Sequence, residues 1–163
     1  MTTSNKPTLR FLLSHPAHLL ALGFGTGLSP KAPGTVGTLL GFPLFWLLSF
    51  LSPLWFWIAL VSLAIVGIWI CDKTGRDLGV SDHGGIVWDE IVAFAMVLAF
   101  AMPTISEFIA AFLLFRLFDI WKPFPIRYFD KNVKGGFGVM LDDLLAAVFA
   151  IVVLELGTWL VRM

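Results

Sequence analysis

The sequence predicts an all-α fold, a compact integral-membrane helical bundle of about five apolar helices with an N-terminal interfacial segment. Hydrophobic residues make up 58% of the 163-residue chain and charged residues only 13%, about half the charged fraction of a typical soluble domain. Residues 38–71 contain no charged side chain. Lysine and arginine gather at one end of the predicted helices. The length is that of a single domain, residues 1–163.

The first elements are an interfacial segment and a helical hairpin. Residues 8–22 are predicted to be amphipathic and to lie at the membrane interface. The uncharged stretch after them is too long for one membrane helix, because it would extend about 51 Å across a hydrocarbon core of about 30 Å. Ser52-Pro53 lies in the middle of this stretch, and proline breaks helices. We therefore expect two helices, 38–51 and 54–71.

Three more apolar helices follow, separated by polar segments. A polar loop over 72–85 precedes helices over 86–102 and 105–121. A second polar segment, 127–138, leads into a last helix over 139–161. Proline residues after the fourth helix stop it from continuing.

The positive charges predict the orientation of the bundle in the membrane. Of the 11 lysine and arginine residues, only Arg162 falls at the far end of the predicted helices. Such asymmetry places the positive end in the cytoplasm. The five predicted helices would then make five passes, with the N-terminus inside and the C-terminus outside. The alternative is a soluble bundle with an unusually apolar core. A net charge of zero gives no indication of nucleic-acid binding.

Six acidic residues fall at this same end, near the ends of three predicted helices: Asp82, Asp89, Glu90, Asp119, Asp142 and Asp143. Clustered carboxylates repel one another unless a cation lies between them. Magnesium binds carboxylate oxygens together with water and substrate phosphate, whereas histidine and cysteine are too sparse for a typical zinc site. We predict a magnesium site formed by Asp89, Glu90, Asp142 and Asp143. The alternative, capping of helix N-termini, fails for Asp119 at a C-terminal end.

Basic residues and glycines in the same region suit a phosphate group. Arg116, Lys122 and Arg127 flank Asp119, and a guanidinium matches phosphate oxygens. Their alternative role is ordinary ion pairing. Two glycine-rich segments, 23–37 and 135–138, could bring backbone N–H groups close to an anion. From the first segment we predict phosphate contacts at Gly25 and Thr26.

Other phosphatase chemistries do not fit the spacing. Cys71 and Arg76 lie one residue too close for the C-x5-R loop of cysteine phosphatases, and no D-x-D-x-[TV] motif of aspartyl-phosphate enzymes is present. His15 and His18 lie in the interfacial segment and His83 stands alone, so no histidine pair indicates a phosphohistidine enzyme. We therefore expect no covalent enzyme intermediate.

Four sequence blocks resemble the signature blocks of the phosphatidylglycerophosphatase A family. They read GFGTGLSPKAPGTVGT (23–38), DHGGIVWDE (82–90), RLFDIWKPFPIRYFD (116–130) and GGFGVMLDDLLAA (135–147). The resemblance covers about residues 15–150. It implies magnesium-dependent hydrolysis of phosphatidylglycerol phosphate to phosphatidylglycerol at the bacterial inner membrane.

The mechanism that we expect uses the carboxylates and basic groups together. Magnesium held by the four carboxylates would activate a water molecule, while Arg116, Lys122 or Arg127 neutralises phosphate oxygens. Asp119 would join the metal ligands or orient water. Two other functions remain open, a phosphatase for another lipid monoester such as phosphatidic acid, and a small cation transporter. The acids lie at one end of the bundle rather than midway across the bilayer, which disfavours transport.

Overall fold

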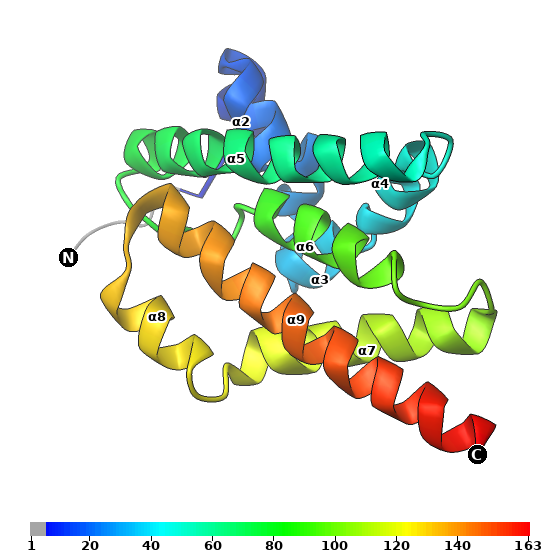
Figure 1. Ribbon diagram of the computed structural model, residues 1–163. Helices are drawn as coiled ribbons and strands as arrows, with labels where there is room; N and C mark the ends of the chain where they lie inside the picture. Colours follow the sequence, from blue (N-terminus) through cyan, green and yellow to red (C-terminus); the bar gives the residue numbers. More distant parts are fainter. Residues whose placement is uncertain (1–5) are drawn as a thin grey trace.

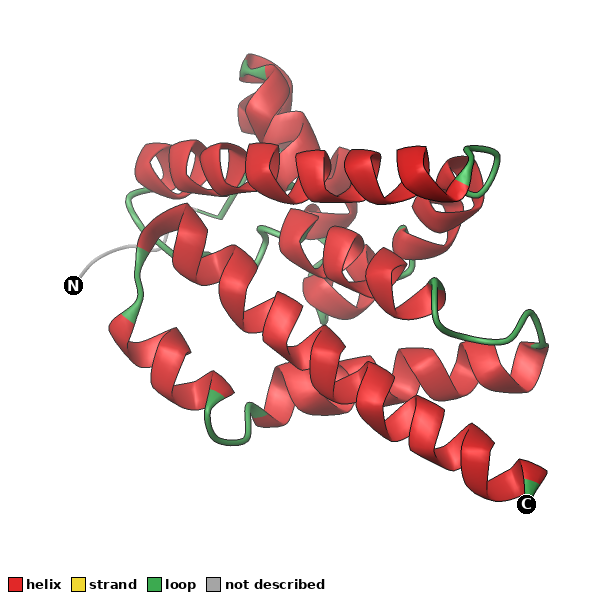
Figure 2. Cartoon of the chain, in the orientation of Figure 1, coloured by secondary structure: helices red, strands yellow, loops and turns green. Residues whose placement is uncertain are grey.

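The computed structural model describes residues 6–163, and the regular secondary structure in this part of the chain is all helical, without a β-strand (Figures 1 and 2). Helix α9 runs diagonally across the molecule and packs against α5, α6 and α7. The elements are α1 Leu9–Ser14, α2 Pro16–Ala21, the 3-10 helix η1 Gly23–Leu28, α3 Pro33–Thr38, α4 Gly41–Leu48, α5 Pro53–Leu78, α6 Trp88–Leu98, α7 Ile105–Trp121, α8 Ile126–Asn132 and α9 Gly135–Arg162. The all-α prediction is confirmed.

The predicted hairpin forms, but its two helices differ in length from the prediction. Helix α4 has only 8 residues, whereas α5 continues for 26 residues through the segment predicted to be a polar loop. The charges in that segment pair one helical turn apart, with Arg76–Asp72 at 2.9 Å and Lys73–Asp77 at 2.8 Å. These pairs support the helix instead of ending it. Gly79 ends it in a left-handed conformation (φ 74°) that favours glycine.

Helix α6 is the centre of the bundle. Its residues from Val92 to Ala95 are fully buried, because α4, α5, α7 and α9 all contact this helix. It is shorter than the predicted 86–102 segment, and at 11 residues it extends about 16 Å. Helix α4, at about 12 Å, is shorter still. Neither helix can cross a hydrocarbon core of about 30 Å by itself.

The C-terminal half contains the α7 helix at its predicted bounds and one unexpected helix, α8, inside the second polar segment. Helix α9 begins four residues before the predicted start. Asp142 and Asp143 therefore lie past the first turn of α9 and do not open it. Helices α5 and α9 cross closely at Gly136, where a Cβ atom would lie 1.8 Å from the Ile68 carbonyl oxygen.

The N-terminal helices pack onto this bundle. Ala17, Ala21 and Leu22 are buried, and the buried His18 places Nε2 2.8 Å from the Asp77 carboxylate of α5. The segment predicted to lie at the interface is therefore held partly against protein. Leu9 remains exposed on its outer side.

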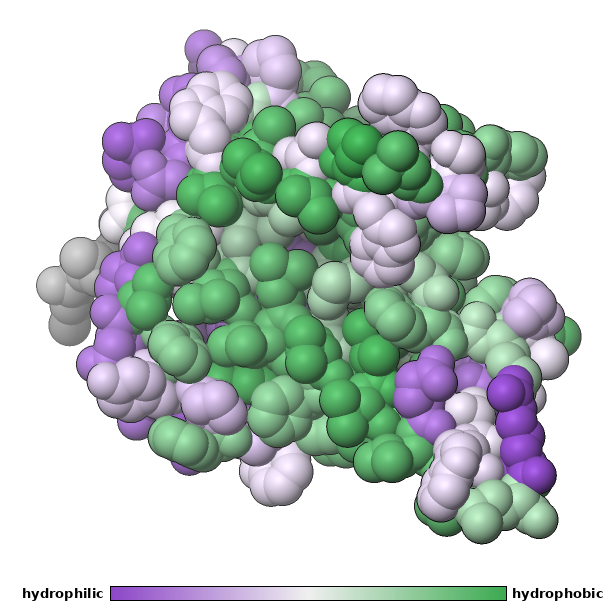
Figure 3. Space-filling model, viewed as in Figure 1, coloured by the Kyte–Doolittle hydropathy of each residue, from purple (hydrophilic) through white to green (hydrophobic). Residues whose placement is uncertain are grey.

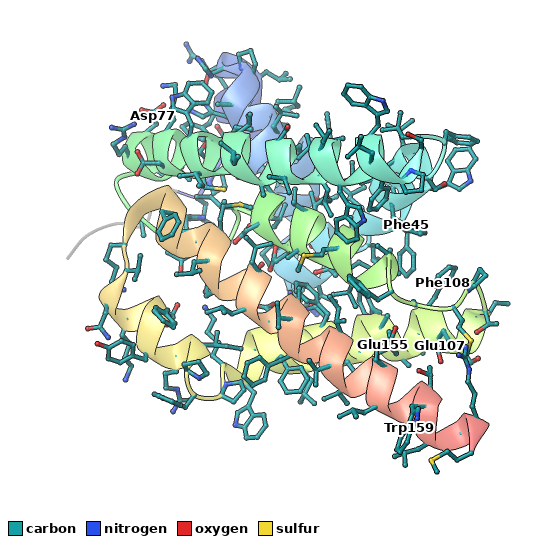
Figure 4. All side chains as sticks on the ribbon, in the orientation of Figure 1. Phe45, Asp77, Glu107, Phe108, Glu155 and Trp159 are labelled. Atoms are coloured by element: carbon teal, nitrogen blue, oxygen red, sulfur yellow. The ribbon has the colours of Figure 1, made fainter. Side chains whose placement is uncertain are left out.

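The surface has an apolar band between polar regions. Figure 3 shows hydrophobic residues over the centre of the molecule, with hydrophilic residues along the left edge and at the lower right. Figure 4 places Asp77 at the left end and Glu107 and Glu155 toward the other. Helices α5 and α9 are long and apolar enough to cross a membrane, and only 28% and 22% of their most apolar windows are buried. A core helix of a soluble protein would be mostly buried.

Candidate functional site

The predicted carboxylates converge on one cavity of about 390 Å³, at the end where α6 and α9 begin and α7 ends. Its lining includes all six acidic residues of the predicted cluster and two of the three predicted basic residues: Asp82, Asp89, Glu90, Asp119, Asp142, Asp143, Arg116 and Lys122. Asp82 comes from the loop before α6, and residues 32–34 also line the cavity. The cavity combines clustered carboxylates with two cationic groups.

The helices bring the carboxylates inward from separate parts of the chain. Asp89 and Glu90 lie in the first turn of α6, where the helix dipole favours negative charge. Asp119 lies in the last turns of α7, and Asp142 and Asp143 lie on the inner side of α9. The four aspartates are each 8% exposed or less. Such burial of carboxylates is expensive unless each oxygen has a partner.

Arg116 is held in place by groups from three elements. Its Nη1 donates to Glu90 Oε1 at 3.0 Å, to Asp119 Oδ2 at 2.5 Å and to Thr38 Oγ1 at 3.3 Å. In the described part of the chain, the hydrogen bonds of Arg116 all use Nη1, and its buried Nε has no hydrogen-bond partner. The side chain is mostly buried, which strengthens its electrostatic interactions.

The segment before α4 supports this arrangement through close contact. Thr38 is fully buried and its hydroxyl donates to the Gly34 carbonyl at 2.8 Å. A Cβ atom at Gly34 would lie 2.0 Å from Glu90 Oε1 and 3.3 Å from Arg116 Nη2. Only glycine lets the backbone of α3 approach these two side chains.

Lys122 ends α7 in a left-handed conformation (φ 46°), and its ammonium lies between two carboxylates. It donates to Asp130 at 2.7 Å and to Asp142. Burial by itself would lower the pKa of Lys122, but its hydrogen bonds to Asp130 and Asp142 outweigh that effect and raise the pKa above its ordinary value. Lys122 therefore stays cationic at the edge of the cavity.

The acidic groups are under electrostatic strain. Burial, followed by repulsion from Glu90 and Asp142, raises the pKa of Asp89 well above its usual range. Burial and repulsion from Asp119 raise the pKa of Glu90 to about 8, against the opposing effect of Arg116. A bound cation would reverse both shifts by favouring the ionised forms.

Four buried carboxylate oxygens of the cavity residues have no hydrogen-bond partner within residues 6–163: Asp89 Oδ1, Glu90 Oε2, Asp142 Oδ1 and Asp143 Oδ2. Hard oxygen donors of this kind suit magnesium, so the donor set fits the predicted ion. Among the described residues, no three acidic, histidine or cysteine side chains already surround a common point. Binding therefore requires rotation of carboxylate side chains.

Three predicted phosphate contacts lie outside this cavity. Arg127 lies on α8 and lines a second cavity with Tyr128 and Lys131, and Lys122 lines both this cavity and the acidic one. Gly25 and Thr26 belong to η1, where the Thr26 hydroxyl donates to the Gly23 carbonyl at 2.9 Å. The part of the first glycine segment that reaches the cavity is residues 32–34.

Sequence reasoning did not assign roles to Gly34, Thr38 or Asp130. Gly34 and Thr38 belong to the first signature block, 23–38, but nothing in the spacing of that block shows which glycine approaches α7. Asp130 is the last residue of the third signature block. Its role as a partner of Lys122 becomes visible only in the structure, where α8 places the two side chains in contact. Cys71 is fully buried in α5 and does not line the cavity.

Comparison with known proteins gives consistent matches. The sequence model for "Phosphatidylglycerophosphatase A" matches residues 19–158. Phosphatidylglycerophosphatase A of Haemophilus influenzae is 51% identical over 154 residues, covering 93% of this chain and 94% of the relative. The Escherichia coli protein of the same name is 48% identical over 144 residues, covering 86% and 83%.

A Bacteroides thetaiotaomicron protein, provisionally named as a phosphatidylinositol-3-phosphatase, is 41% identical over 152 residues, covering 88% of this chain and 94% of the relative. No solved structure matches the chain at a significant level.

Proposed function

This chain belongs to the phosphatidylglycerophosphatase A family, and we propose that it hydrolyses phosphatidylglycerol phosphate to phosphatidylglycerol and inorganic phosphate in phospholipid biosynthesis. The observation that supports this reaction is one cavity whose lining combines carboxylates that have unpaired oxygens with Arg116 and Lys122. Carboxylates suit a divalent ion and a water nucleophile, and the two cations suit a phosphate group.

We propose that the enzyme depends on magnesium held by Asp89, Glu90, Asp142 and Asp143. When bound, the ion supplies a water of lowered pKa and stabilises charge on the phosphoryl oxygens. Their unpaired oxygens support this ligand set. The same carboxylates repel each other without a cation.

The side chains of the cavity bind and orient the phosphomonoester. Arg116 and Lys122 neutralise its non-bridging oxygens, and Asp119 holds Arg116 in position through the 2.5 Å ion pair. The water oxygen forms a bond to phosphorus, the bond from phosphorus to the glycerol oxygen breaks, and the leaving oxygen takes up a proton. A cavity carboxylate accepts the proton lost by water.

We propose further that the protein is a multi-pass protein of the bacterial inner membrane, with α5 and α9 crossing the bilayer and the active site facing the cytoplasm. Support comes from the low buried fraction of these two helices and from the ten lysine and arginine residues predicted at the cavity end. In this orientation the cavity would lie at the depth of the lipid headgroups, so the phospholipid substrate could reach it without leaving the membrane.

Phosphate release from purified protein tests this function. With phosphatidylglycerol phosphate in mixed micelles, we expect turnover with magnesium, loss of turnover in excess chelator, and recovery when magnesium is restored. Asp143→Asn is the inactive control. Absence of release from wild-type protein that binds magnesium would contradict the proposal.

A second lipid monoester is the alternative substrate. The provisional name of the Bacteroides thetaiotaomicron relative supports a different headgroup, since the same cavity could accept any accessible phosphomonoester. Parallel assays with phosphatidic acid and phosphatidylinositol 3-phosphate discriminate these substrates by kcat/KM. Ion flux in proteoliposomes tests the transporter alternative.

A further inference from the structure

Helix α7 carries a continuous stripe of exposed branched aliphatic side chains. The stripe consists of Ile105, Ile109, Leu113, Leu117 and Ile120, which are 80%, 55%, 60%, 51% and 70% exposed. Their spacing of three or four residues keeps them on one side of the helix. Over the 15 intervals from Ile105 to Ile120, the helix rises about 22 Å.

One end of this stripe is part of the acidic cavity. Ile120 lines the cavity together with Arg116, which is one turn earlier on the same helix. Leu113 lies three residues before Arg116, so it shares this side of α7. Within a single turn, the surface of α7 changes from a phosphate-binding lining to an apolar face.

The protein also has an apolar groove that is distinct from the α7 stripe. It has a volume of about 410 Å³ between α5 and α9, with Met96 of α6 in its lining. Among the described residues, none lines both this groove and the acidic cavity. On α9 the groove uses Leu141 and Leu144, whereas the cavity uses Asp142 and Asp143. A lipid in this groove is therefore separated from the carboxylates by α9.

We propose that the α7 stripe is the surface along which the acyl chains of the lipid substrate lie while its phosphate occupies the cavity beside Arg116. This inference rests on the proposed function. The substrate must place a charged phosphate in the cavity and keep its hydrocarbon chains out of water. The stripe meets both needs because it is continuous with the cavity at Ile120 and about as long as an extended acyl chain.

Contacts along the stripe orient the substrate as well as hold it. Lipid and protein are similarly apolar, so moving a chain from bilayer to helix gains little hydrophobic energy. What the stripe supplies is many small dispersion contacts in a fixed geometry, which align the phosphate with the cavity. Chain-length preference should therefore depend on the stripe.

The first test compares long and short substrates in one detergent. The variant Ile109→Ala/Leu113→Ala shortens the stripe outside the cavity, and Leu54→Ala/Ile65→Ala removes the same residue types from exposed positions of α5, which are 67% and 62% exposed. The readout is kcat/KM for dioleoyl divided by kcat/KM for dihexanoyl phosphatidylglycerol phosphate. We expect this ratio to fall about tenfold in the α7 variant and to stay within about twofold of wild type in the α5 control.

The second test locates the chain directly. Phosphatidylglycerol phosphate with a mid-chain diazirine is irradiated with magnesium-free wild-type protein, and labelled peptides are mapped. We expect labelling in 105–121 that excess dioleoyl phosphatidylglycerol phosphate suppresses. Uniform, unsuppressed labelling of α5, α7 and α9 would mean contact with bulk lipid only, and no labelling of α7 would mean that another surface, such as a second copy, covers it. Either result overturns the inference.

The proposed function and the assignment of the α7 stripe are contradicted by different results. If wild-type protein hydrolyses neither substrate, the proposed function is wrong. If it hydrolyses both, and the ratio is the same in the α7 variant as in wild type, only the assignment of the stripe is wrong.

Discussion

Gly34→Ala tests the close contact between α3 and the arginine of the cavity. The added Cβ atom would lie 2.0 Å from Glu90 Oε1 and 3.0 Å from Glu90 Cδ, far inside van der Waals contact. The Glu90 side chain is largely buried and bonded to Arg116 at 3.0 Å, so it cannot move without breaking that bond. Losing one hydrogen bond between charged groups costs about 1.5–3 kcal/mol.

This energy sets the expected size of the effect. Each 1.4 kcal/mol corresponds to about tenfold in rate, so we expect kcat/KM for phosphatidylglycerol phosphate to fall by about 10- to 100-fold. Gly157→Ala is the control, because a Cβ atom there meets nothing within 4 Å. Phosphate release and thermal unfolding are measured on the same preparations. If Gly34→Ala keeps wild-type kcat/KM, the close contact between Gly34 and Glu90 does not matter for activity. If Gly157→Ala loses as much activity as Gly34→Ala, the loss cannot be attributed to that contact.

Three further outcomes follow from the site and the charge distribution. Asp143→Asn should cut turnover by more than about 100-fold, abolish the rise of Tm on adding magnesium, and stabilise the metal-free protein, because it removes one member of a repelling cluster; a normal magnesium-dependent rise would contradict the ligand assignment. Cys71→Ser should stay active, since Cys71 is buried outside the cavity; an inactive but folded variant would reopen cysteine chemistry. In that Cys71→Ser background, an impermeant thiol reagent should label a cysteine at Thr104 in intact cells and one at Ser81 only after permeabilisation; the reverse pattern would invert the proposed orientation.

The sequence predicts structure best where interactions between neighbouring residues decide the secondary structure. The 105–121 helix is confirmed to the residue, because a turn, an apolar run and a following proline leave few alternatives. The hairpin at Ser52-Pro53 also forms. Prediction failed over 72–77, where charges indicated a loop. Ion pairs one turn apart make the same residues good helix formers, and composition does not distinguish these outcomes.

The contacts of the site depended on tertiary packing. The convergence of the carboxylates could be anticipated, since each lies near the same end of its helix. The contact of Thr38 with Arg116 could not, because 78 residues separate them. The sequence groups Arg127 with Arg116, but α8 places Arg127 in a second cavity that shares Lys122 with the acidic one. A short helix in a polar segment leaves too weak a periodic signal to predict that displacement.

The buried acidic cluster connects stability with function. Asp89 and Asp143 are nearly inaccessible, and each has an oxygen without a partner, an arrangement that lowers folding stability. The surrounding structure can bear this cost because α6 is packed against several other helices, including α4, α5, α7 and α9. Asparagine at these positions would relieve the repulsion and keep the shape, so stability does not explain the carboxylates. A ligand that pairs with anionic oxygens does explain them, and it would favour the folded protein in proportion to its binding. The strain at this end of the bundle is therefore itself an argument for a divalent cation in the proposed reaction.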